Sequence, residues 1–265
     1  MSINTRPTAV AGLFYPANAA ELRHDVVHYL EHASVLQNSD EPVKAIIAPH
    51  AGYIYSGPIA ANAYIQLQKT ANSIERVILL GPCHRVPVSG IASSSASYFA
   101  TPLGNVPVDR SLTQQLETLP QVNCNDAAHE QEHSLEVHLP FLQVMLDEFT
   151  LVPLVVGECS ATDVAQVLKM AWGGSETVIV VSSDLSHFHD YQTAKEIDKQ
   201  TSQAIEQLKP DSISSNGACG SYPIKGLLNL AREIGLQVTT LDVRNSGDTA
   251  GDKSQVVGYG AYSLQ

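Results

Sequence analysis

Histidines follow three apolar runs of this sequence, at the point where each run ends. The runs are Val43–Ala48, Arg76–Leu80 and Thr177–Ser182. His50 and His84 follow the first two, and the pair Asp184 and His187 follows the third. Short, β-branched runs that are apolar on both faces are typical of buried strands in a sheet covered by helices. Because ligands of open α/β sheets bind beyond the carboxyl ends of the strands, we expect these four side chains to meet at one edge.

Two of these histidines are suited to holding a metal ion. Imidazole is the usual protein ligand for iron, copper, nickel or zinc, and two histidines with one anionic ligand and open positions are typical of a non-haem metal site. Asp184, Glu132 and Cys219 are the candidates for the anionic ligand. Cys219 precedes an expected helix, and a thiol beside a helix N-terminus has a lowered pKa. A small buried cysteine with no ligand role is the alternative, and spacing alone leaves both open.

The segment from Glu132 to His138 also carries polar groups that could support such a site. Its sequence is EHSLEVH, which is unusual for the start of an ordinary helix. A solvated polar face explains much of the pattern, but Glu132 and His133 could also orient a ligand histidine. Tyr53, close to His50, could bring a phenol into the same cleft, although core packing is the more common use of such a residue.

A second histidine pattern resembles that of zinc proteases. His129-Glu130-Gln131-Glu132-His133 matches H-E-x-x-H, which places two histidines on one helix face. The amphipathic helix is expected to begin near residues 132–134, so His129 would lie in a loop before it. This context disfavours a metalloprotease.

Composition narrows the class of protein further. The chain has 265 residues, of which 44% are hydrophobic and 16% charged, with a net charge of −12. An acidic surface repels phosphate, so nucleic acid and anionic membranes are poor candidates for partners. No apolar segment is long enough for a membrane span, and the first ten residues do not resemble a signal peptide. The four scattered cysteines form no CxxC pair, which favours a reducing cytoplasm.

Strand-like and helix-like segments alternate along the whole chain. Further strands are expected at 151–156, 237–243 and 256–264, and helices at 58–67, 112–119, 133–147, 161–172, 193–208 and 223–234. The polar segment Ser34–Pro42 is expected to be a surface loop. This alternation predicts an α/β fold, a three-layer α/β/α sandwich with a central mixed, largely parallel sheet. With no linker or repeat in view, residues 1–265 are expected to form a single domain.

Several motifs together resemble the Memo family, also called AmmeMemoRadiSam system protein B. The resemblance runs nearly end to end and rests on Arg6-Pro7, Ala11–Pro16, Ala48–Gly57, Gly81–His84, Glu132–Glu136, Ser182–Asp184 with His187, and Cys219-Gly220. It implies a fold similar to the class III extradiol dioxygenases, which are non-haem iron(II) enzymes. It also implies that His50, His84 and Cys219 bind the metal, with Asp184 and His187 lining the same pocket.

The resemblance leaves two functions to weigh. In the first, the protein is a redox enzyme that binds iron(II) or copper, since thiolate in place of carboxylate softens the site. His187 would act as acid and base toward a small-molecule substrate, and Asp184 would orient His187 or a metal-bound water.

In the second, the protein is a non-catalytic metal- or phosphopeptide-binding module, or a scaffold with a vestigial site. The scarcity of arginines beyond residue 76 argues mildly against phosphate binding. Family association points to an AMMECR1-type protein and a radical SAM enzyme as partners.

Overall fold

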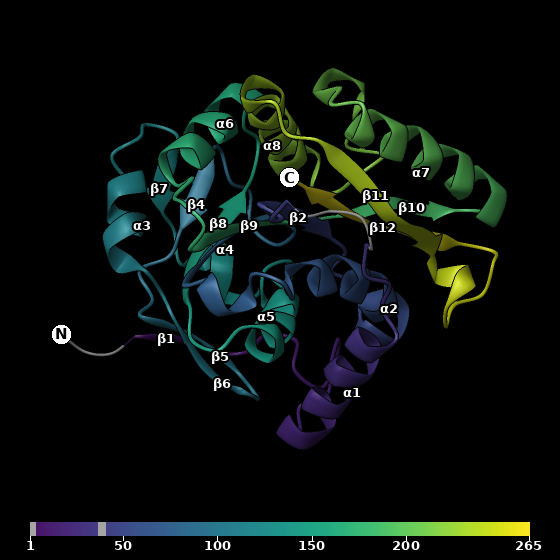
Figure 1. The fold of residues 1–265 in the computed structure, drawn as a ribbon, viewed down its shortest axis with the longest axis horizontal. Helices are drawn as coiled ribbons and strands as arrows, with labels where there is room; N and C mark the ends of the chain where they lie inside the picture. The colour runs from purple at the N-terminus through teal and green to yellow at the C-terminus, as the bar shows by residue number, and fades with distance from the viewer. Residues whose placement is uncertain (1–3, 37–40) are drawn as a thin grey trace.

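The computed structural model describes residues 4–36 and 41–265, and within them a large mixed sheet runs through the middle of the molecule (Figure 1). Its strands are β2 (Ala45–Ala48), β3 (Arg76–Pro82), β4 (Ile91–Ser93), β7 (Val122–Cys124), β8 (Thr150–Val156), β9 (Thr177–Ser182), β10 (Asp184–His189), β11 (Val238–Asn245) and β12 (Val256–Leu264). The order across the sheet is β10-β12-β2-β9-β3-β8-β4-β7, with β11 also paired to β12.

The four strands β2, β9, β3 and β8 run parallel to their neighbours in the centre of this sheet. Ala48 is paired with Ser182 and Leu80 with Val181, so these strands end at the same level. The residues that follow them therefore come out at one edge. At the end of the sheet, β12 is antiparallel to both β2 and β10, which makes the sheet mixed.

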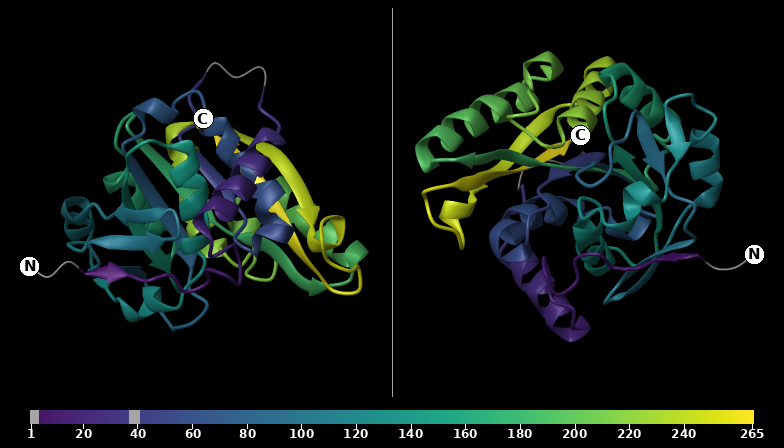
Figure 2. Two further views of the ribbon diagram at one scale, coloured as in Figure 1. Left: turned by 90° about the horizontal axis from the view of Figure 1, so that it is seen from below. Right: turned by 180° about the vertical axis from the view of Figure 1, so that it is seen from behind.

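Helices cover both faces of the sheet, and alternate residues of the strands are buried in two separate apolar cores. Ile46, Val77 and Val180 belong to the core that includes residues of α1 (Ala19–Glu31), α2 (Tyr53–Tyr64) and α5 (Leu139–Met145). Ile47 and Ile78 belong to the core beneath α6 (Ala161–Met170), α7 (Tyr191–Glu206) and α8 (Ser221–Ile234). Figures 1 and 2 show these helices on opposite sides of the sheet, which confirms the predicted three-layer architecture.

Smaller elements complete the fold. A second sheet joins β1 (Thr5–Arg6), β5 (Tyr98–Thr101) and β6 (Gly104–Pro107). The short helices α3 (Arg110–Leu116) and α4 (Ala127–Glu130) precede a 3-10 turn at Glu136–His138 that leads into α5. The small sheet ties the N-terminal segment to the side of the molecule that carries α5 (Figure 1).

Most of the expected elements are present, and the differences have local causes. Helix α1 was not among the predicted elements, although Asn18 caps it and Leu22, Val26 and Leu30 form its buried face. The short strands β4 to β7 were not predicted either. The helix expected at 133–147 begins later, as α5 at Leu139, because a 3-10 turn occupies 136–138.

Two further expectations concern loops. Asp184 to His187, expected after a strand, themselves belong to a strand, β10, which is stabilised by pairing with β12 rather than by local pattern. Of the loop expected at Ser34–Pro42, residues 37–40 lie outside the described residues, and the rest forms no helix or strand. Among the described residues, none of the helices combines the length and apolar character that a membrane crossing requires.

Candidate metal centre

A cavity of about 480 Å³ opens at the edge of the sheet where the central parallel strands end. The residues that line it come from the N-terminal segment, the start of α2, β10 and the connection between β11 and β12. Its polar side includes His133, Asp184 and His187, and its apolar and aromatic side includes Phe14, Tyr55 and Tyr259. The cavity therefore combines titratable groups with an apolar wall, as substrate pockets do.

His50, His84 and His133 form a compact group at this edge. Their ligand atoms all lie within 4.8 Å of one another, and no other group of three or more His, Cys, Asp and Glu side chains in residues 4–36 and 41–265 does so. The ring of His50 lies 5.2 Å from that of His84 and 5.4 Å from that of His133, and the rings of His84 and His133 are 4.7 Å apart. This group could hold a metal ion.

The neighbours of His50 fix which of its ring nitrogens is free. The hydroxyl of Ser182 donates to the carbonyl of Ser134 at 2.6 Å, so its oxygen must accept a hydrogen bond from Nδ1 of His50, also at 2.6 Å. The proton therefore sits on Nδ1 and the lone pair on Nε2. Burial, together with the neighbouring His133 and His84, holds the pKa of His50 well below its usual value. His50 is therefore neutral, the state that binds metals.

His84 is oriented by the buried carboxylate of Glu132. Its Nδ1 lies 2.9 Å from Oε1 of Glu132, and its backbone N–H donates to Oε2 at 2.6 Å. Oε1 also accepts from the backbone N–H groups of His133 and Ser134. Burial alone would raise the pKa of Glu132, but these bonds and the charge interaction with His84 lower it to about 2. An ionised carboxylate that accepts from Nδ1 leaves Nε2 of His84 available to a metal, a common support for ligand histidines.

A buried ion pair anchors the segment that carries Glu132 and His133. Arg6 pairs with Glu136, and its other nitrogens donate to the carbonyls of His129 at 2.9 Å and Glu132 at 2.5 Å. Glu136 is fully buried and also accepts from Tyr15 and from two backbone N–H groups of the N-terminal segment. The first β-strand and the residues after it thus clamp the 132–136 segment against the sheet edge.

His133 was expected behind the ligand histidines, but its ring lies beside theirs. The ring also packs against Phe14 at 4.8 Å, which brings the N-terminal segment to the site. Burial is the largest of the effects that lower the pKa of His133, to about 4. Its buried Nδ1 has no hydrogen-bond partner among the described residues, although Oε1 of Glu132 lies 3.3 Å away. A buried imidazole nitrogen without a partner is an energetic cost that a bound ion could remove.

Cys219 lies next to His50 but outside the three-histidine group. Its Sγ is 3.4 Å from Nε2 of His50, and the backbone N–H of Asp184 donates to it at 3.3 Å. The expectation that the helix N-terminus lowers the pKa of this thiol is wrong. Burial and the neighbouring Asp184 carboxylate raise the pKa instead, because both disfavour a second negative charge.

Asp184 and His187 both line the cavity, held by different partners. Asp184 accepts from the backbone N–H of His50 at 2.7 Å, and its Oδ2 lies 4.0 Å from Nε2 of that residue. Burial raises the pKa of Asp184 to about 6. Nδ1 of His187 lies 2.9 Å from the carbonyl of Leu185, which can only accept, so Nε2 of His187 carries the free lone pair. The hydrogen bonds thus tie Asp184 to His50 rather than to His187.

Comparison with known proteins places the chain in a family. The family model described as "Memo-like protein" matches residues 6–263. The chain belongs to the Memo family. Two relatives, each named "MEMO1 family protein", come from Sulfolobus acidocaldarius and Ignicoccus hospitalis. The first is 35% identical over 96% of this chain and 97% of that protein, and the second 36% identical over 97% of each. A third, from Aquifex aeolicus, is 35% identical over 97% of this chain and 98% of that protein.

Solved structures support the fold of this Memo family chain. A structure described as that of uncharacterized protein JW3007 from Escherichia coli K12 matches with a TM-score of 0.51. It covers 82% of this chain and 99% of that chain at 13% sequence identity. At this level of identity the likeness concerns the fold alone.

Other residues singled out from the sequence lie away from the cavity of this Memo family protein. The hydroxyl of Tyr53 donates to the carbonyl of Val137 at 2.6 Å, inside the core. His138 is buried, with Nδ1 2.7 Å from the hydroxyl of Tyr64. His129 lies in α4 rather than in a loop, and its Nε2 bonds to the carbonyl of Ala92. It is not part of the three-histidine group, so the H-E-x-x-H pattern here does not form the zinc site of a protease.

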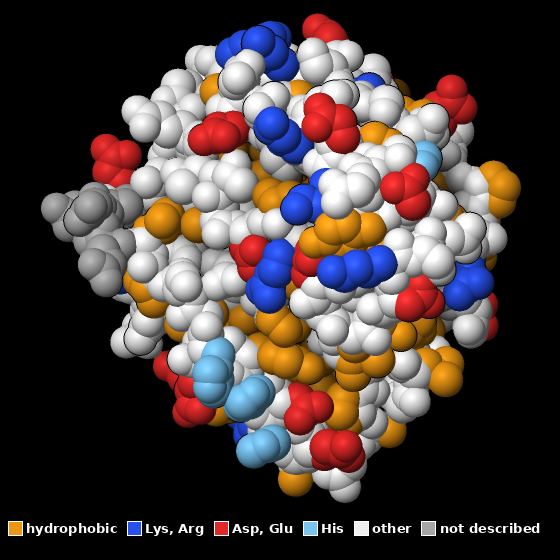
Figure 3. Space-filling model, turned by 90° about the vertical axis from the view of Figure 1, so that its right-hand side faces the viewer, with side chains coloured by type: hydrophobic (Ala, Val, Ile, Leu, Met, Phe, Trp, Pro, Cys, Tyr) orange, Lys and Arg blue, Asp and Glu red, His pale blue; other side chains and the backbone are white. Residues whose placement is uncertain are grey.

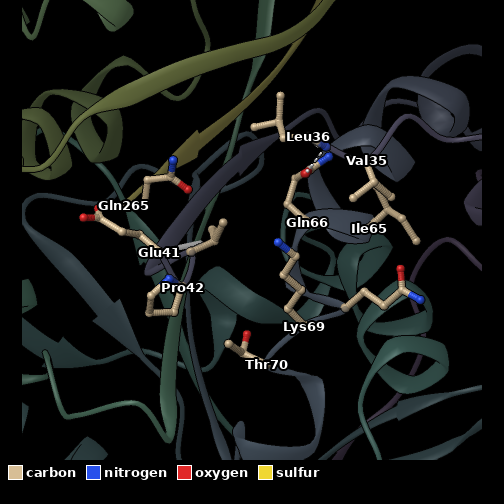
Figure 4. Close-up of a pocket in the computed structure, with 11 residues that line it drawn as sticks. Val35, Leu36, Glu41, Pro42, Ile65, Gln66, Lys69, Thr70 and Gln265 are labelled. Carbon is tan, nitrogen blue, oxygen red and sulfur yellow. Dashed lines mark hydrogen bonds between the residues drawn. The ribbon is translucent and has the colours of Figure 1, made fainter. Parts of the chain in front are cut away.

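A second cavity, of about 100 Å³, lies near the C-terminal ends of α2 and of the chain (Figure 4). Its lining is mainly aliphatic and amide side chains, among them Val35, Leu36, Ile65, Gln66 and Gln265. Gln66 accepts from the backbone N–H of Leu36 at 3.0 Å and so fixes the segment after α1. The described lining of this cavity includes no histidine or cysteine.

Proposed function

We propose that this Memo family protein binds a redox-active metal ion in the group formed by His50, His84 and His133 and acts as a non-haem oxidoreductase. Iron(II) is the first candidate and copper the second. The observation that carries the proposal is the group itself, three imidazoles with ligand atoms within 4.8 Å of one another beside a cavity of about 480 Å³. Imidazole suits both metals.

The donor set fits a metal ion. Ser182 and Glu132 hold the protons of His50 and His84 on Nδ1, which leaves both Nε2 atoms free to coordinate. The pKa of His50 lies well below its usual value because of burial, so no proton competes at neutral pH. The buried Nδ1 of half-buried His133 makes no hydrogen bond within the described residues, which also supports a bound ion here.

We assign Cys219 as an additional, anionic donor beside His50. Its Sγ lies 3.4 Å from Nε2 of His50, and the N–H of Asp184 points to the sulfur, where it would stabilise a thiolate. Because burial raises the pKa of this thiol, metal binding would release its proton. A bound ion of this kind supplies one-electron redox chemistry.

The remaining groups of the cavity would handle substrate and protons. Nε2 of His187 is free to exchange a proton with a bound molecule, because the Leu185 carbonyl holds the opposite nitrogen. Phe14, Tyr55 and Tyr259 offer an apolar wall, while Asp184 and Asp252 bring negative charge. No lysine or arginine is among the described residues that line the cavity, so it suits a neutral or cationic substrate better than a phosphopeptide.

The test is the metal content of untagged protein purified without oxygen, measured by mass spectrometry beside matched variants. We expect about one iron or copper per chain, lost in His50→Ala and kept in His187→Ala, which would retain the metal but lose turnover of phenolic substrates with oxygen. Cys219→Ser shows whether the three histidines bind the metal alone or together with Cys219, because this variant loses metal only if the thiolate is a donor.

Several outcomes would contradict the proposal. One is a wild-type protein that stays free of metal after reconstitution with iron and with copper, which would favour a peptide-binding module. Another is a His50→Ala variant that binds metal as the wild type does. Circular dichroism of each variant shows that a loss of metal does not reflect a loss of fold.

A further inference from the structure

A second set of histidines lies on the outer face of α1 and at its C-cap, away from the centre described above. His24, His28 and His32 follow one another at intervals of four residues, and all three are exposed. Residues four apart in a helix are neighbours on its surface. Figure 3 shows a group of histidine side chains on the molecular surface, with acidic side chains on either side.

Of the three, His28 and His32 form the closer pair. Their ring centroids are 4.3 Å apart, whereas those of His24 and His28 are 6.4 Å apart. Nδ1 of His32 lies 2.7 Å from the carbonyl oxygen of His28, which can only accept, so the proton is on Nδ1 and the lone pair on Nε2. A carbonyl that holds Nδ1–H in this way is a common support for a metal-ligating histidine.

The helix beneath this pair is held in place at its start and along its inner face. The side chain of Asn18 accepts from the N–H groups of Ala20 and Glu21 and caps the helix. Leu22, Val26 and Leu30 are buried in the core. Because the backbone is fixed and the histidines point outward, only side-chain rotation is needed to bring two imidazoles to one ion.

The charge around the pair favours a cation. α1 carries Glu21, Asp25 and Glu31 against one basic side chain, Arg23, and the whole chain has a net charge of −12. Asp25 lies one turn before His28, on the same side of the helix. An acidic surface of this kind raises the local concentration of cations.

We propose that His28 and His32 form a second, surface metal site that takes a divalent transition ion with a preference for imidazole, Zn²⁺, Ni²⁺ or Cu²⁺. His24 is a weaker auxiliary donor. Two histidines four residues apart on one helix face are the same pair of donors that the H-E-x-x-H helix uses for zinc. Two protein donors leave several positions of the ion open to water or to an external chelator. This site does not depend on the function proposed for the buried centre.

Retention on Ni²⁺ immobilised through nitrilotriacetate tests the proposal directly. This chelate leaves two open positions on the ion, which a nearby pair of surface imidazoles can fill. We expect untagged wild-type protein to bind the resin and to elute with imidazole. His28→Ala with His32→Ala should appear in the flow-through, since loss of a chelating pair weakens binding by about a hundredfold. His24→Ala should elute only slightly earlier than wild type.

A spacing control keeps the number of histidines constant. In the His24→Ala protein, which has no other pair four residues apart on this face, His32→Gln combined with Ala33→His moves one imidazole off the shared face, and it should lose retention like the double alanine variant. The proposal is overturned if wild-type protein does not bind, if the double alanine variant binds like wild type, or if the spacing control is retained.

Equilibrium dialysis against Zn²⁺ then distinguishes the two sites by the number of zinc ions that each variant binds in solution. The double alanine variant should lose one equivalent of zinc that His50→Ala keeps. Loss of the same equivalent in both variants would refute a separate site on α1.

Discussion

The two histidine groups of this protein differ in how the chain brings their members together. His24, His28 and His32 share one face of one helix, so their proximity follows from a spacing of four residues. His50, His84 and His133 come from three separate segments and meet only because the ends of two parallel strands and a clamped loop converge. The first group is exposed and has one orienting hydrogen bond, from Nδ1 of His32 to the carbonyl of His28. The second is surrounded by buried partners.

This difference predicts different properties. In the group of His50, His84 and His133, Ser182 and Glu132 fix the ring nitrogens of His50 and His84, and only His50 is fully buried, with His133 half-buried and His84 exposed. Binding there should be tight and selective, because the protein has already lost the entropy of ordering the ligands. The exposed pair must order two side chains on binding, so it should bind more weakly and exchange faster. Four predictions test this contrast.

The largest expected effect is acid destabilisation of the metal-free protein. Burial is the main cause that lowers the pKa of His129 and His133 to about 4 and that of His138 to about 3. The unfolded chain, whose histidines titrate near 6.5, then binds more protons, so stability falls as the pH drops from 6.5 toward 4. At about 1.4 kcal/mol per pKa unit, the loss is on the order of 5–10 kcal/mol.

Asp184 partly offsets this loss of stability at low pH. Burial raises its pKa to about 6, so its contribution is greatest below pH 4 and is lost as the pH rises through 6. It offsets about 3 kcal/mol of the histidine effect. Urea unfolding at pH 7, 6, 5 and 4 measures the net effect of these groups on the free energy of unfolding. In His138→Gln, this free energy should depend less on pH than in wild type. A stability independent of pH over this range would show that the histidines are not buried as the structure has them.

Removal of the ion pair that clamps the buried group should have the next largest effect. Arg6→Ala leaves the fully buried Glu136 without its cation, which typically costs about 3–5 kcal/mol. Chemical denaturation of the metal-free protein measures the loss, and Arg85→Ala, at an exposed arginine near the same edge, is the control. If both variants unfolded at the same urea concentration, the clamp would contribute nothing.

Glu132→Gln addresses metal binding more selectively. Glutamine has a single acceptor oxygen where the carboxylate now serves His84, His133 and Ser134, so His84 loses its orienting charge. Loss of such a partner typically weakens metal affinity by about 10–100-fold. Competition with a coloured chelator gives the affinity of the buried group, while retention on the nickel resin, which depends on α1, should not change. Unchanged affinity would mean that Glu132 does not support the site.

The smallest effect is expected at the start of α1. Asn18→Ala removes the side-chain oxygen that accepts from Ala20 and Glu21, at a cost of about 1 kcal/mol. The Asn18→Ala variant should then elute slightly earlier from the nickel resin, because the helix that carries His28 frays more often. Metal content of the buried group should stay as in wild type. Thermal unfolding with Asn72→Ala, at a residue that caps no α-helix, serves as the comparison.

Several features of the fold could be predicted from residue pattern alone. Runs such as Arg76–Leu80 and Thr177–Ser182 are so uniformly apolar and β-branched that only a doubly covered sheet can bury them, and they form β3 and β9. Their ends then direct His84 and Asp184 to one edge. In contrast, α1 was not predicted, because its i, i+4, i+8 pattern of Leu22, Val26 and Leu30 lies among many polar residues.

The sequence by itself therefore determined the layers, the positions of the main strands along the chain, the family, and the edge at which His50 and His84 emerge. Only the tertiary structure decided that His133 joins them, that Glu132 supports His84, and that Arg6 reaches Glu136 across 130 residues of chain. It also decided the pKa of Cys219, where burial outweighs the helix N-terminus. The reason is physical: periodicity reports which face of a segment is buried, whereas these contacts depend on which distant segments pack against each other.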